Sequence, residues 1–437
     1  MSEANTAIFE QLIQYQKPIT HEEPHLYLVK DTLADKLHKD AADTLELVGV
    51  ECHDRRVIRP LEETGLAGYD DSTSRVYFLP EAVEQAISTG PGIEDFPVPM
   101  HSFGGGGVAS WVQERDGKVV QPELEKHIRE LMEPAAKHGW NFMFKSVSGK
   151  YTPEEEEKQI REIRRYYDGY LFMRAETDIG IERCVEEYED TGKICTTHSI
   201  LLTPLTFNET DRNLEIFCQS AKKNLPLYLT PMPFAFENAP GSIYGVAVQA
   251  TAEFYAALCL ARAINPDVTV VNGAYPAMTR PGPDKVYPLD LGGLPHLFAN
   301  YITSQASIRQ GLPAIQSGCT ISGCMHEPVG GESDEQTNIA ARIWNGLDFH
   351  MLRHVFGFTK DLAVYSLDKQ DDDMRTVHNV LRGHETIPVR IPDLYRPGVP
   401  ESIAESVNNG DWKLSSHSIR YGSELLEQQK LEYWTQD

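Results

Sequence analysis

Residues 225–275 read LPLYLTPMPFAFENAPGSIYGVAVQATAEFYAALCLARAINPDVTVVNGAY, and this stretch decides the expected fold. It begins with a short apolar run (225–232), continues through a long helical window (242–264) and ends in a second apolar run (267–275). Two strands joined by a helix of this length pair in parallel through a right-handed crossover. The stretch therefore predicts one strand–helix–strand unit.

The same alternation extends over most of the chain. Eight apolar runs have the length of buried strands and end at residues that favour turns: 97–103, 139–147, 168–175, 195–202, 225–232, 267–275, 313–319 and 348–356. Helical windows lie between them at 123–138, 154–167, 179–191, 208–223, 242–264, 290–310 and 333–346. Eight such units predict an α/β fold of the (β/α)8 TIM-barrel type. An open doubly wound sheet is the alternative, but no GxGxxG follows an early strand, which weakens its dinucleotide-binding form.

Three regions are expected along the chain. Residues 1–95 have helical spacing of apolar positions and predict an N-terminal helical extension. Residues 96–383 hold the strand–helix repeats and form the predicted TIM-barrel catalytic domain. The proline-rich segment 384–437 is interpreted as a C-terminal arm that packs on the barrel or on a second subunit, and we expect a homo-oligomer.

Composition excludes several classes of protein. Apolar residues make up 41% of the 437 residues and recur throughout, which excludes disorder for most of the chain. The formal net charge is −25, so no nucleic acid is expected as a partner, because phosphate binding needs a basic patch. An acidic protein remains compatible with a small cationic substrate.

Cysteine usage and apolar windows indicate the compartment. Seven cysteines is an odd number, and five of them are scattered without the spacing of a disulfide framework: Cys52, Cys184, Cys195, Cys218 and Cys259. Reduced thiols of this kind are typical of a cytosol. No basic stretch followed by an apolar one begins the sequence, and the most apolar window, 244–264, carries Gln249, Glu253 and Arg262. We therefore expect a cytoplasmic protein with a buried amphipathic helix and no membrane partner.

The active site of a (β/α)8 barrel is built at the carboxyl ends of the strands. The predicted ends are rich in aromatic residues, among them Phe103, Phe234, Tyr275 and Phe356, and one carboxylate, Glu176, stands among them. Aromatic faces attract quaternary ammonium groups, and one acid would balance the charge. The alternative for each aromatic residue is that it packs under the loops.

Two further segments lie near the predicted strand ends. The run Gly104–Gly107 follows the first predicted strand, and as a loop it could admit a ligand closely, form a phosphate nest or act as a lid. Cys319, Cys324 and His326 fall within nine residues and could ligate Zn²⁺, although their spacing is not typical of zinc sites. A polar loop above the pocket with no bound metal is the favoured interpretation.

Several stretches together resemble the trimethylamine methyltransferase superfamily, a group of TIM barrels. They are Leu202–Phe207 (LTPLTF), Leu229–Phe234 (LTPMPF), Gln249–Glu253 (QATAE), Asn272–Pro276 (NGAYP), Gly311–Pro313 (GLP) and Ser366–Asp368 (SLD). The resemblance runs from about Ile200 to Leu381. The combination of PLTF, TPMP and the QAxAE helix carries it, since each motif alone is weak.

The resemblance implies an activity. Members move a methyl group from a methylated amine to Co(I) of a corrinoid (cobalamin) carried by a small partner protein. The founding members use pyrrolysine in a loop that would correspond to 317–327, where this chain has SGCTISGCMHE instead. Relatives without pyrrolysine act on quaternary amines such as glycine betaine, proline betaine or carnitine.

The same resemblance implies roles for individual residues, and no acid or base catalyst is needed, because a quaternary amine departs neutral once its methyl group is attacked. The expected cation-facing aromatics are Phe103, Phe234, Tyr275 and Phe356, and Glu176 is expected to balance the charge. Gln316, His326 and His354 are expected to bind a substrate carboxylate or the corrinoid face. Two alternatives stay open: a zinc-thiol methyltransferase that uses Cys319, Cys324 and His326, and a non-catalytic barrel that binds a methylated osmolyte.

Overall fold

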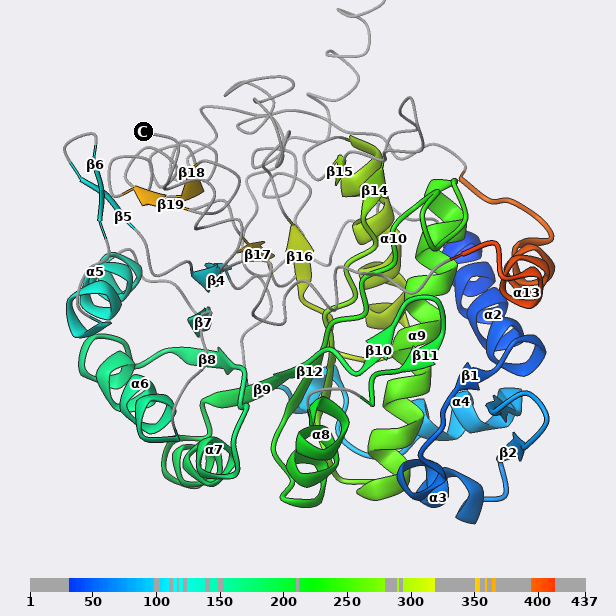
Figure 1. Ribbon diagram of the computed structural model, residues 1–437, viewed down its shortest axis with the longest axis horizontal. Helices are drawn as coiled ribbons and strands as arrows, with labels where there is room; N and C mark the ends of the chain where they lie inside the picture. Colours follow the sequence, from blue (N-terminus) through cyan, green and yellow to red (C-terminus); the bar gives the residue numbers. More distant parts are fainter. Residues whose placement is uncertain are drawn as a thin grey trace, which may run out of the picture.

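The computed structural model describes residues 31–97, 103–109, 113–115, 118–120, 124–137, 142–147, 153–209, 212–279, 289–290, 294–318, 350–353, 358–359, 364–366 and 394–412. An eight-stranded sheet lies at the centre (Figure 1), and every pairing in it is parallel. Its strands, in sheet order, are β13 (Val270–Asn272), β12 (Leu227–Leu229), β9 (Ile194–His198), β8 (Tyr170–Met173), β7 (Phe142–Val147), β4 (Phe103–Ala109), β17 (His350–Arg353) and β16 (Gln316–Gly318). Seven of them overlap the predicted runs closely.

The first predicted strand is wrong in position. The run 97–103 was expected to end at Phe103, whereas β4 begins there and continues to Ala109. Gly104–Gly107 are therefore strand residues, paired with 142–145 of β7, and not a loop. Glycine has a low propensity for strands because it loses much backbone entropy when it is held extended, so propensity does not predict a strand here. The neighbouring strands β7 and β17 pair with β4 and hold it extended.

The two outer strands of the sheet meet at Asn272. Its backbone N–H donates to Pro313 O (2.8 Å), and its carbonyl accepts from Ile315 N (2.8 Å). The resulting parallel bridge joins Asn272 of β13 to Ala314, two residues before β16 begins. The parallel pairing thus runs from β13 through all eight strands and back to the segment that leads into β16.

Helices cover the outside of this sheet. In chain order they are α5 (Leu124–Lys137), α6 (Pro153–Tyr166), α7 (Asp178–Thr191), α8 (Asn213–Lys222), α9 (Ile243–Ile264) and α10 (Leu294–Arg309). Figure 1 shows them in an arc around the strands, in the same order as in the sequence. Six predicted helical windows are confirmed within a few residues, and the seventh, 333–346, lies outside the described residues.

Helix α9 is the core element of the structure. The hydroxyl of Ser242 accepts from Gly245 N at its start, and every residue from Tyr244 to Arg262 is buried. By length and composition α9 is the one helix in the described ranges that could cross a membrane, and 94% of its apolar window lies inside the protein. The sequence predicted a buried amphipathic helix, but α9 is covered on every face.

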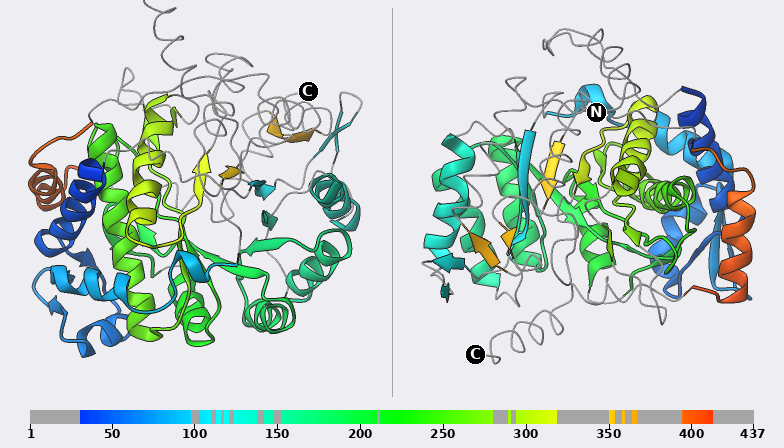
Figure 2. Two further views of the ribbon diagram at one scale, coloured as in Figure 1. Left: turned by 180° about the vertical axis from the view of Figure 1, so that it is seen from behind. Right: turned by 90° about the horizontal axis from the view of Figure 1, so that it is seen from above.

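The covering on the far side of α9 comes from the N-terminal extension. Helices α2 (Asp31–Leu47), α3 (Arg55–Glu63) and α4 (Pro80–Ser88) pack against it, as both views in Figure 2 show. The extension is not purely helical, because it also contains β1 (Val50–Glu51), β2 (Ala67–Asp70) and β3 (Arg75–Phe78). These join β10 (Leu201–Leu202) and β11 (Thr206–Phe207) in a five-stranded sheet of order β10-β11-β1-β3-β2. The extension is therefore hydrogen-bonded to the segment that follows β9.

The remaining elements are small. A 3-10 turn, η1 (Ile93–Asp95), leads into β4. Strands β5 (Gln113–Arg115), β6 (Lys118–Val120), β18 (Phe358–Thr359) and β19 (Val364–Ser366) form a four-stranded sheet, and β14 (Met278–Thr279) pairs with β15 (Leu289–Asp290).

The described part of the C-terminal arm, 394–412, packs on its own chain. Helix α13 (Val399–Asn409) lies against α2 and α9. Tyr395 sits edge-on to Tyr244 with ring centroids 5.4 Å apart, and Lys36 Nζ lies 3.8 Å above the Tyr395 ring. Of the two expected packing partners, this part of the arm uses the core of its own subunit.

One face of the central sheet carries an apolar layer. Its buried members are Phe96, Tyr170, Phe172, Cys195, Tyr228, Val271 and Ile315. Tyr228 of β12 is fully buried, and it occupies space that a side chain at position 273 would need. A Cβ at Gly273 would lie 2.2 Å from Tyr228 Cζ.

We expect Gly273→Ala to destabilise the protein by about 1–3 kcal/mol, because the buried Tyr228 ring must move in a close-packed layer. Urea unfolding followed by circular dichroism measures this loss. Gly68→Ala in β2 is the control, since no atom lies within 4 Å of the added Cβ. Equal stability of the two variants would contradict the packing described here.

Candidate functional site

The segments that follow β12 and β13 stay side by side beyond the carboxyl ends of these strands. Gly273 N donates to Leu229 O, Tyr275 N to Pro231 O and Ala277 N to Pro233 O, each at 2.8 Å. The prolines of the TPMP motif have no backbone N–H to donate, but their carbonyl oxygens accept hydrogen bonds. The hydrogen bonds named above therefore run in one direction, from the segment after β13 to the segment after β12. The two segments form one wall at the carboxyl end of the sheet.

Two of the predicted site residues lie on this wall. Phe234 and Tyr275 are both buried, and Phe234 pairs with Ala277, two residues after Tyr275. Paired residues on neighbouring strands point to the same face, and so do residues two apart on one extended segment. Phe234 therefore shares a face with Ala277, and Ala277 shares it with Tyr275, so both rings lie on the same side of the wall. Tyr275 also meets His296 of α10 edge-to-face, with centroids 4.9 Å apart.

Glu176 differs from the prediction of a lone carboxylate. Its Oε1 lies 3.1 Å from Arg174 Nε, and more than a third of its side chain is exposed. A carboxylate that is already paired and solvated has little charge left for a substrate cation. The sequence could not show this pairing, because it arises from the turn after β8.

That turn is held by a second, buried carboxylate. Glu156 of α6 accepts hydrogen bonds from Glu176 N (2.7 Å) and Thr177 N (3.1 Å). Burial raises the pKa of Glu156, and these hydrogen bonds counteract the rise. Glu156 thereby fixes the backbone of Glu176 and Thr177, at the start of α7.

Phe103 and Gln316 lie at the other end of the sheet. Gln316 is the first residue of β16, Phe103 the first of β4, and both pair with His350, the first residue of β17. The predicted position of Phe103 at a carboxyl end is therefore wrong, and Gln316 also begins rather than ends its strand. His326, His354, Phe356, Cys319 and Cys324 lie outside the described residues.

The motif residues that carry the family resemblance contact one another in the structure. Glu253 of α9 is fully buried, and its carboxylate accepts hydrogen bonds from Thr203 Oγ1 (2.9 Å), Leu205 N (3.1 Å) and Gln249 Nε2 (3.2 Å). Gln249 Nε2 also donates to Asn238 O (2.9 Å), in the segment after β12. Burial raises the pKa of Glu253 to about 7, although its three donors favour the ionised form.

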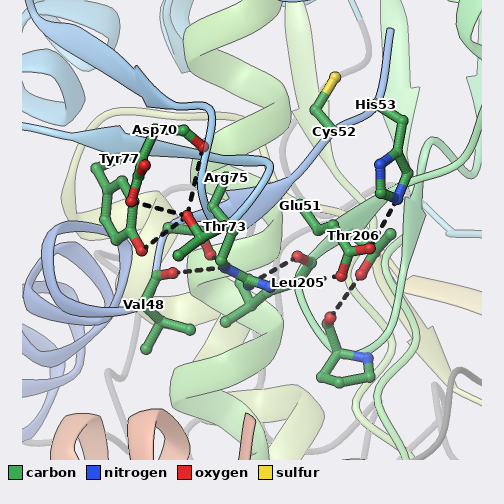
Figure 3. A network of polar contacts seen from close by, with 12 residues as sticks. Val48, Glu51, Cys52, His53, Asp70, Thr73, Arg75, Tyr77, Leu205 and Thr206 are labelled. Atoms are coloured by element: carbon green, nitrogen blue, oxygen red, sulfur yellow. Dashed lines mark hydrogen bonds and ion pairs between the residues drawn. The ribbon is translucent and has the colours of Figure 1, made fainter. Parts of the chain in front are cut away.

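Leu205 is held from the opposite side by Arg75. The Arg75 guanidinium donates to three backbone carbonyls: Val48 O (2.7 Å), Gly49 O (2.9 Å) and Leu205 O (3.1 Å). Figure 3 shows it between Val48 and Leu205. Leu205 has a φ of 44°, a left-handed conformation that is unfavourable for leucine. Strained residues persist where several contacts specify them, and here both sides of the Leu205 residue are bound to buried charged groups.

Gln249 and Glu253 belong to the QATAE motif, but no role at the site was predicted for them from the sequence. The signal was present, because two polar residues one helical turn apart in an apolar helix must find buried partners. Which loops would supply these partners depends on the packing of α9 and is not written in the local sequence.

The described residues give little support for proton transfer by a histidine or for a bound metal ion. His198, the last residue of β9, is buried beside Phe217 of α8, and burial together with the nearby Arg174 charge lowers its pKa to about 3. Among the described residues, no group of three His, Cys, Asp or Glu side chains could hold a metal ion. The five described cysteines are free thiols: Cys52, Cys184, Cys195, Cys218 and Cys259.

Comparison with known proteins identifies no family. No family model and no curated protein matches the chain. Among solved structures it is similar to a truncated 3-deoxy-D-arabino-heptulosonate 7-phosphate synthase from Thermotoga maritima (12% identity, 65% of this chain and 87% of that chain, TM-score 0.37). It is also similar to 7,8-dihydropteroate synthase from Vibrio fischeri (14%, 66% and 94%, TM-score 0.39) and to an endoglucanase from Clostridium longisporum (10%, 68% and 99%, TM-score 0.36). Identities and TM-scores this low carry no argument about function, so the function has to be argued from the residues of this chain.

The Glu253 network makes a prediction about pH. The pKa of Glu253 rises from 4.5 to about 7 on folding, so between these pH values the folded protein keeps a proton that the unfolded chain releases. The contribution of Glu253 to the free energy of unfolding therefore falls as the pH rises through this window, by up to about 1.4 kcal/mol per unit. Glu253→Gln keeps an acceptor for Leu205 N and offers Thr203 Oγ1 a donor.

We expect wild type and Glu253→Gln to have similar melting temperatures near pH 4.5, and the variant to be the more stable one above pH 7. Thermal unfolding from pH 4.5 to 8 tests this expectation through the difference between the two proteins, which cancels other titrating groups. Glu253→Ala, which leaves three donors without an acceptor, should be less stable than Glu253→Gln at every pH. A difference in melting temperature between wild type and Glu253→Gln that does not change with pH would contradict the raised pKa of Glu253.

Proposed function

We propose that this chain is a methyltransferase on a (β/α)8 barrel. It would take one methyl group from a quaternary amine such as glycine betaine and pass it to the Co(I) corrinoid of a small partner protein. The observation that carries the proposal is the contact between the motifs of the resemblance: PLTF meets the QAxAE helix at Glu253, and the same helix holds the segment after TPMP through Gln249. Motifs that are far apart in the sequence thus act as one unit at the carboxyl ends of β9 and β12.

The described residues at this end fit a quaternary ammonium group. Phe234 and Tyr275 offer aromatic rings that are removed from water, where cation–π attraction is stronger than at an exposed site. A buried, largely apolar site also strips water from the amine and orders it for in-line attack. The role proposed for these residues is to bind and orient the substrate.

The electron balance needs no acid or base from the chain. The bond between carbon and nitrogen breaks, its electron pair stays on nitrogen, and the amine leaves as a neutral tertiary amine. The corrinoid supplies the nucleophilic Co(I) that accepts the methyl group. The neutral His198 and the paired Glu176 are consistent with a site that transfers no proton.

The proposal is tested by incubating the full chain with glycine betaine and a Co(I) corrinoid, free or on a corrinoid protein, and measuring dimethylglycine. We expect its formation to depend on both the chain and the reduced corrinoid. Binding of glycine betaine without demethylation, with corrinoid protein supplied, would indicate the non-catalytic osmolyte-binding barrel. Stoichiometric zinc in active protein, with activity lost on chelation, would indicate the zinc-thiol enzyme instead.

Tyr275→Leu should raise the KM for glycine betaine by about five- to tenfold, because an aliphatic side chain keeps much of the volume but loses the cation–π attraction. Steady-state kinetics of dimethylglycine formation measure the change. Phe78→Leu, a similar truncation of a buried ring in β3 of the extension, is the control and should leave KM unchanged. A KM that does not respond to Tyr275→Leu would remove this residue from the binding site.

A further inference from the structure

The segment after β12 ends in a tight turn that begins at Phe234, one of the two aromatic residues of the wall. The carbonyl of Phe234 accepts from Glu237 N (3.3 Å) and Asn238 N (3.1 Å). Phe236 N donates to Ala239 O (3.0 Å), which closes the tip of the turn. The turn therefore folds back on Phe234 through its own backbone.

The side chain of Asn238 completes this turn from inside. Its Oδ1 accepts from Phe234 N (2.8 Å), so both polar groups of the Phe234 backbone are bound within the turn. Asn238 is fully buried, and Gln249 Nε2 of α9 donates to its carbonyl (2.9 Å). Among the described residues, Asn238 Nδ2 has no hydrogen-bond partner. An unpartnered buried donor is destabilising, which indicates that this position requires the acceptor at Oδ1.

The tip of the turn is strained. Phe236 has a φ of 67°, a left-handed conformation that favours glycine or asparagine over phenylalanine. Its ring lies against Gly241, where an added Cβ would be 2.2 Å from Phe236 Cε1. Strain of this kind persists where the surrounding structure specifies the backbone, and it is common at functional sites. The turn therefore has one specified conformation, with Phe234 at its base.

We propose that Asn238 is a positioning residue that holds the ring of Phe234 in place on the wall. The inference rests on the proposed function, in which Phe234 faces the quaternary ammonium group. Backbone dihedral angles limit the rotamers of a side chain, so fixing the N–H and carbonyl of Phe234 also restricts the direction of its ring. A ring that is oriented before the ligand arrives loses less conformational entropy on binding. Asn238 acts through Phe234 and contacts no ligand in this role.

Tyr275, the second ring of the wall, is held by other contacts. Its N–H donates to Pro231 O (2.8 Å), which precedes the turn, and its ring meets His296 of α10. The position of Tyr275 should therefore not depend on Asn238, which makes Tyr275 the reference for the experiment.

Calorimetric titration of the full chain with glycine betaine tests this role through double-mutant cycles. We expect Asn238→Ala to weaken binding by about fivefold, from lost preorganisation, and Phe234→Leu by about five- to tenfold. The double variant Asn238→Ala/Phe234→Leu should bind like Phe234→Leu alone, because no aromatic ring is left to be positioned. When Asn238→Ala is combined with Tyr275→Leu, the two losses should multiply to about 25- to 50-fold.

Asn265→Ala is the matched control. Asn265 also holds a turn through its side chain, since its Oδ1 accepts from Asp267 N (3.0 Å), but it follows the last residue of α9, whereas Asn238 precedes the first. Both variants should lower the melting temperature, and only Asn238→Ala should change the affinity for glycine betaine. Asn238→Leu, which fills a similar volume without an acceptor, should repeat the result of Asn238→Ala and serves where the alanine variant does not fold.

The outcomes distinguish the two proposals. If wild type binds glycine betaine and the losses of Asn238→Ala and Phe234→Leu multiply, the positioning role is overturned and the proposed function stands. Wild-type affinity in Asn238→Ala has the same meaning. If neither Asn238→Ala nor Asn238→Leu folds, the fold itself requires Asn238 and the positioning role is overturned. Failure of wild type to bind glycine betaine would overturn the quaternary-amine function and the role of Asn238 with it.

Discussion

A carboxylate buried in the middle of an apolar helix is the constraint on which the rest of the structure depends. Glu253 has no access to water, so its oxygens must be met by donors from elsewhere in the chain. These donors come from Thr203 and Leu205 after β9 and from Gln249 one turn earlier, which also reaches the segment after β12. Helix α9 thereby fixes two of the loops at the carboxyl end of the sheet, and both loops border the site.

The N-terminal extension completes this arrangement from outside. Arg75 and the backbone of Glu51 both donate to Leu205 O, while Glu253 accepts from Leu205 N. The extension is thus part of the support of the site, because a leucine with a left-handed backbone needs contacts on both sides. The same helices bury the far side of α9, which explains how a helix with no polar face can exist in this fold.

The residues at the site differ in how well the sequence predicted them. Phe234 and Tyr275 were predicted from their place after two strands, and the structure puts them on one wall. Glu176 was predicted from its carboxylate and its place at the end of a predicted strand, but in the structure it is paired with Arg174. Asn238 was not predicted, because the hydrogen bond from Phe234 N to its side chain is visible only when the turn after β12 is placed.

The sequence by itself predicted seven strands of the central sheet and the six described helices that cover it, since the period of apolar residues reflects which face of each element is buried. It also indicated that the helix over 244–264 is buried in the protein, because Gln249, Glu253 and Arg262 interrupt its apolar window. Only the tertiary structure decided that Gly104–Gly107 form a strand, that Phe103 lies at the amino end, and that Arg174 pairs with Glu176. The physical reason is that strand register and the partners of buried polar groups are set by neighbours distant in the chain, which local propensity does not contain.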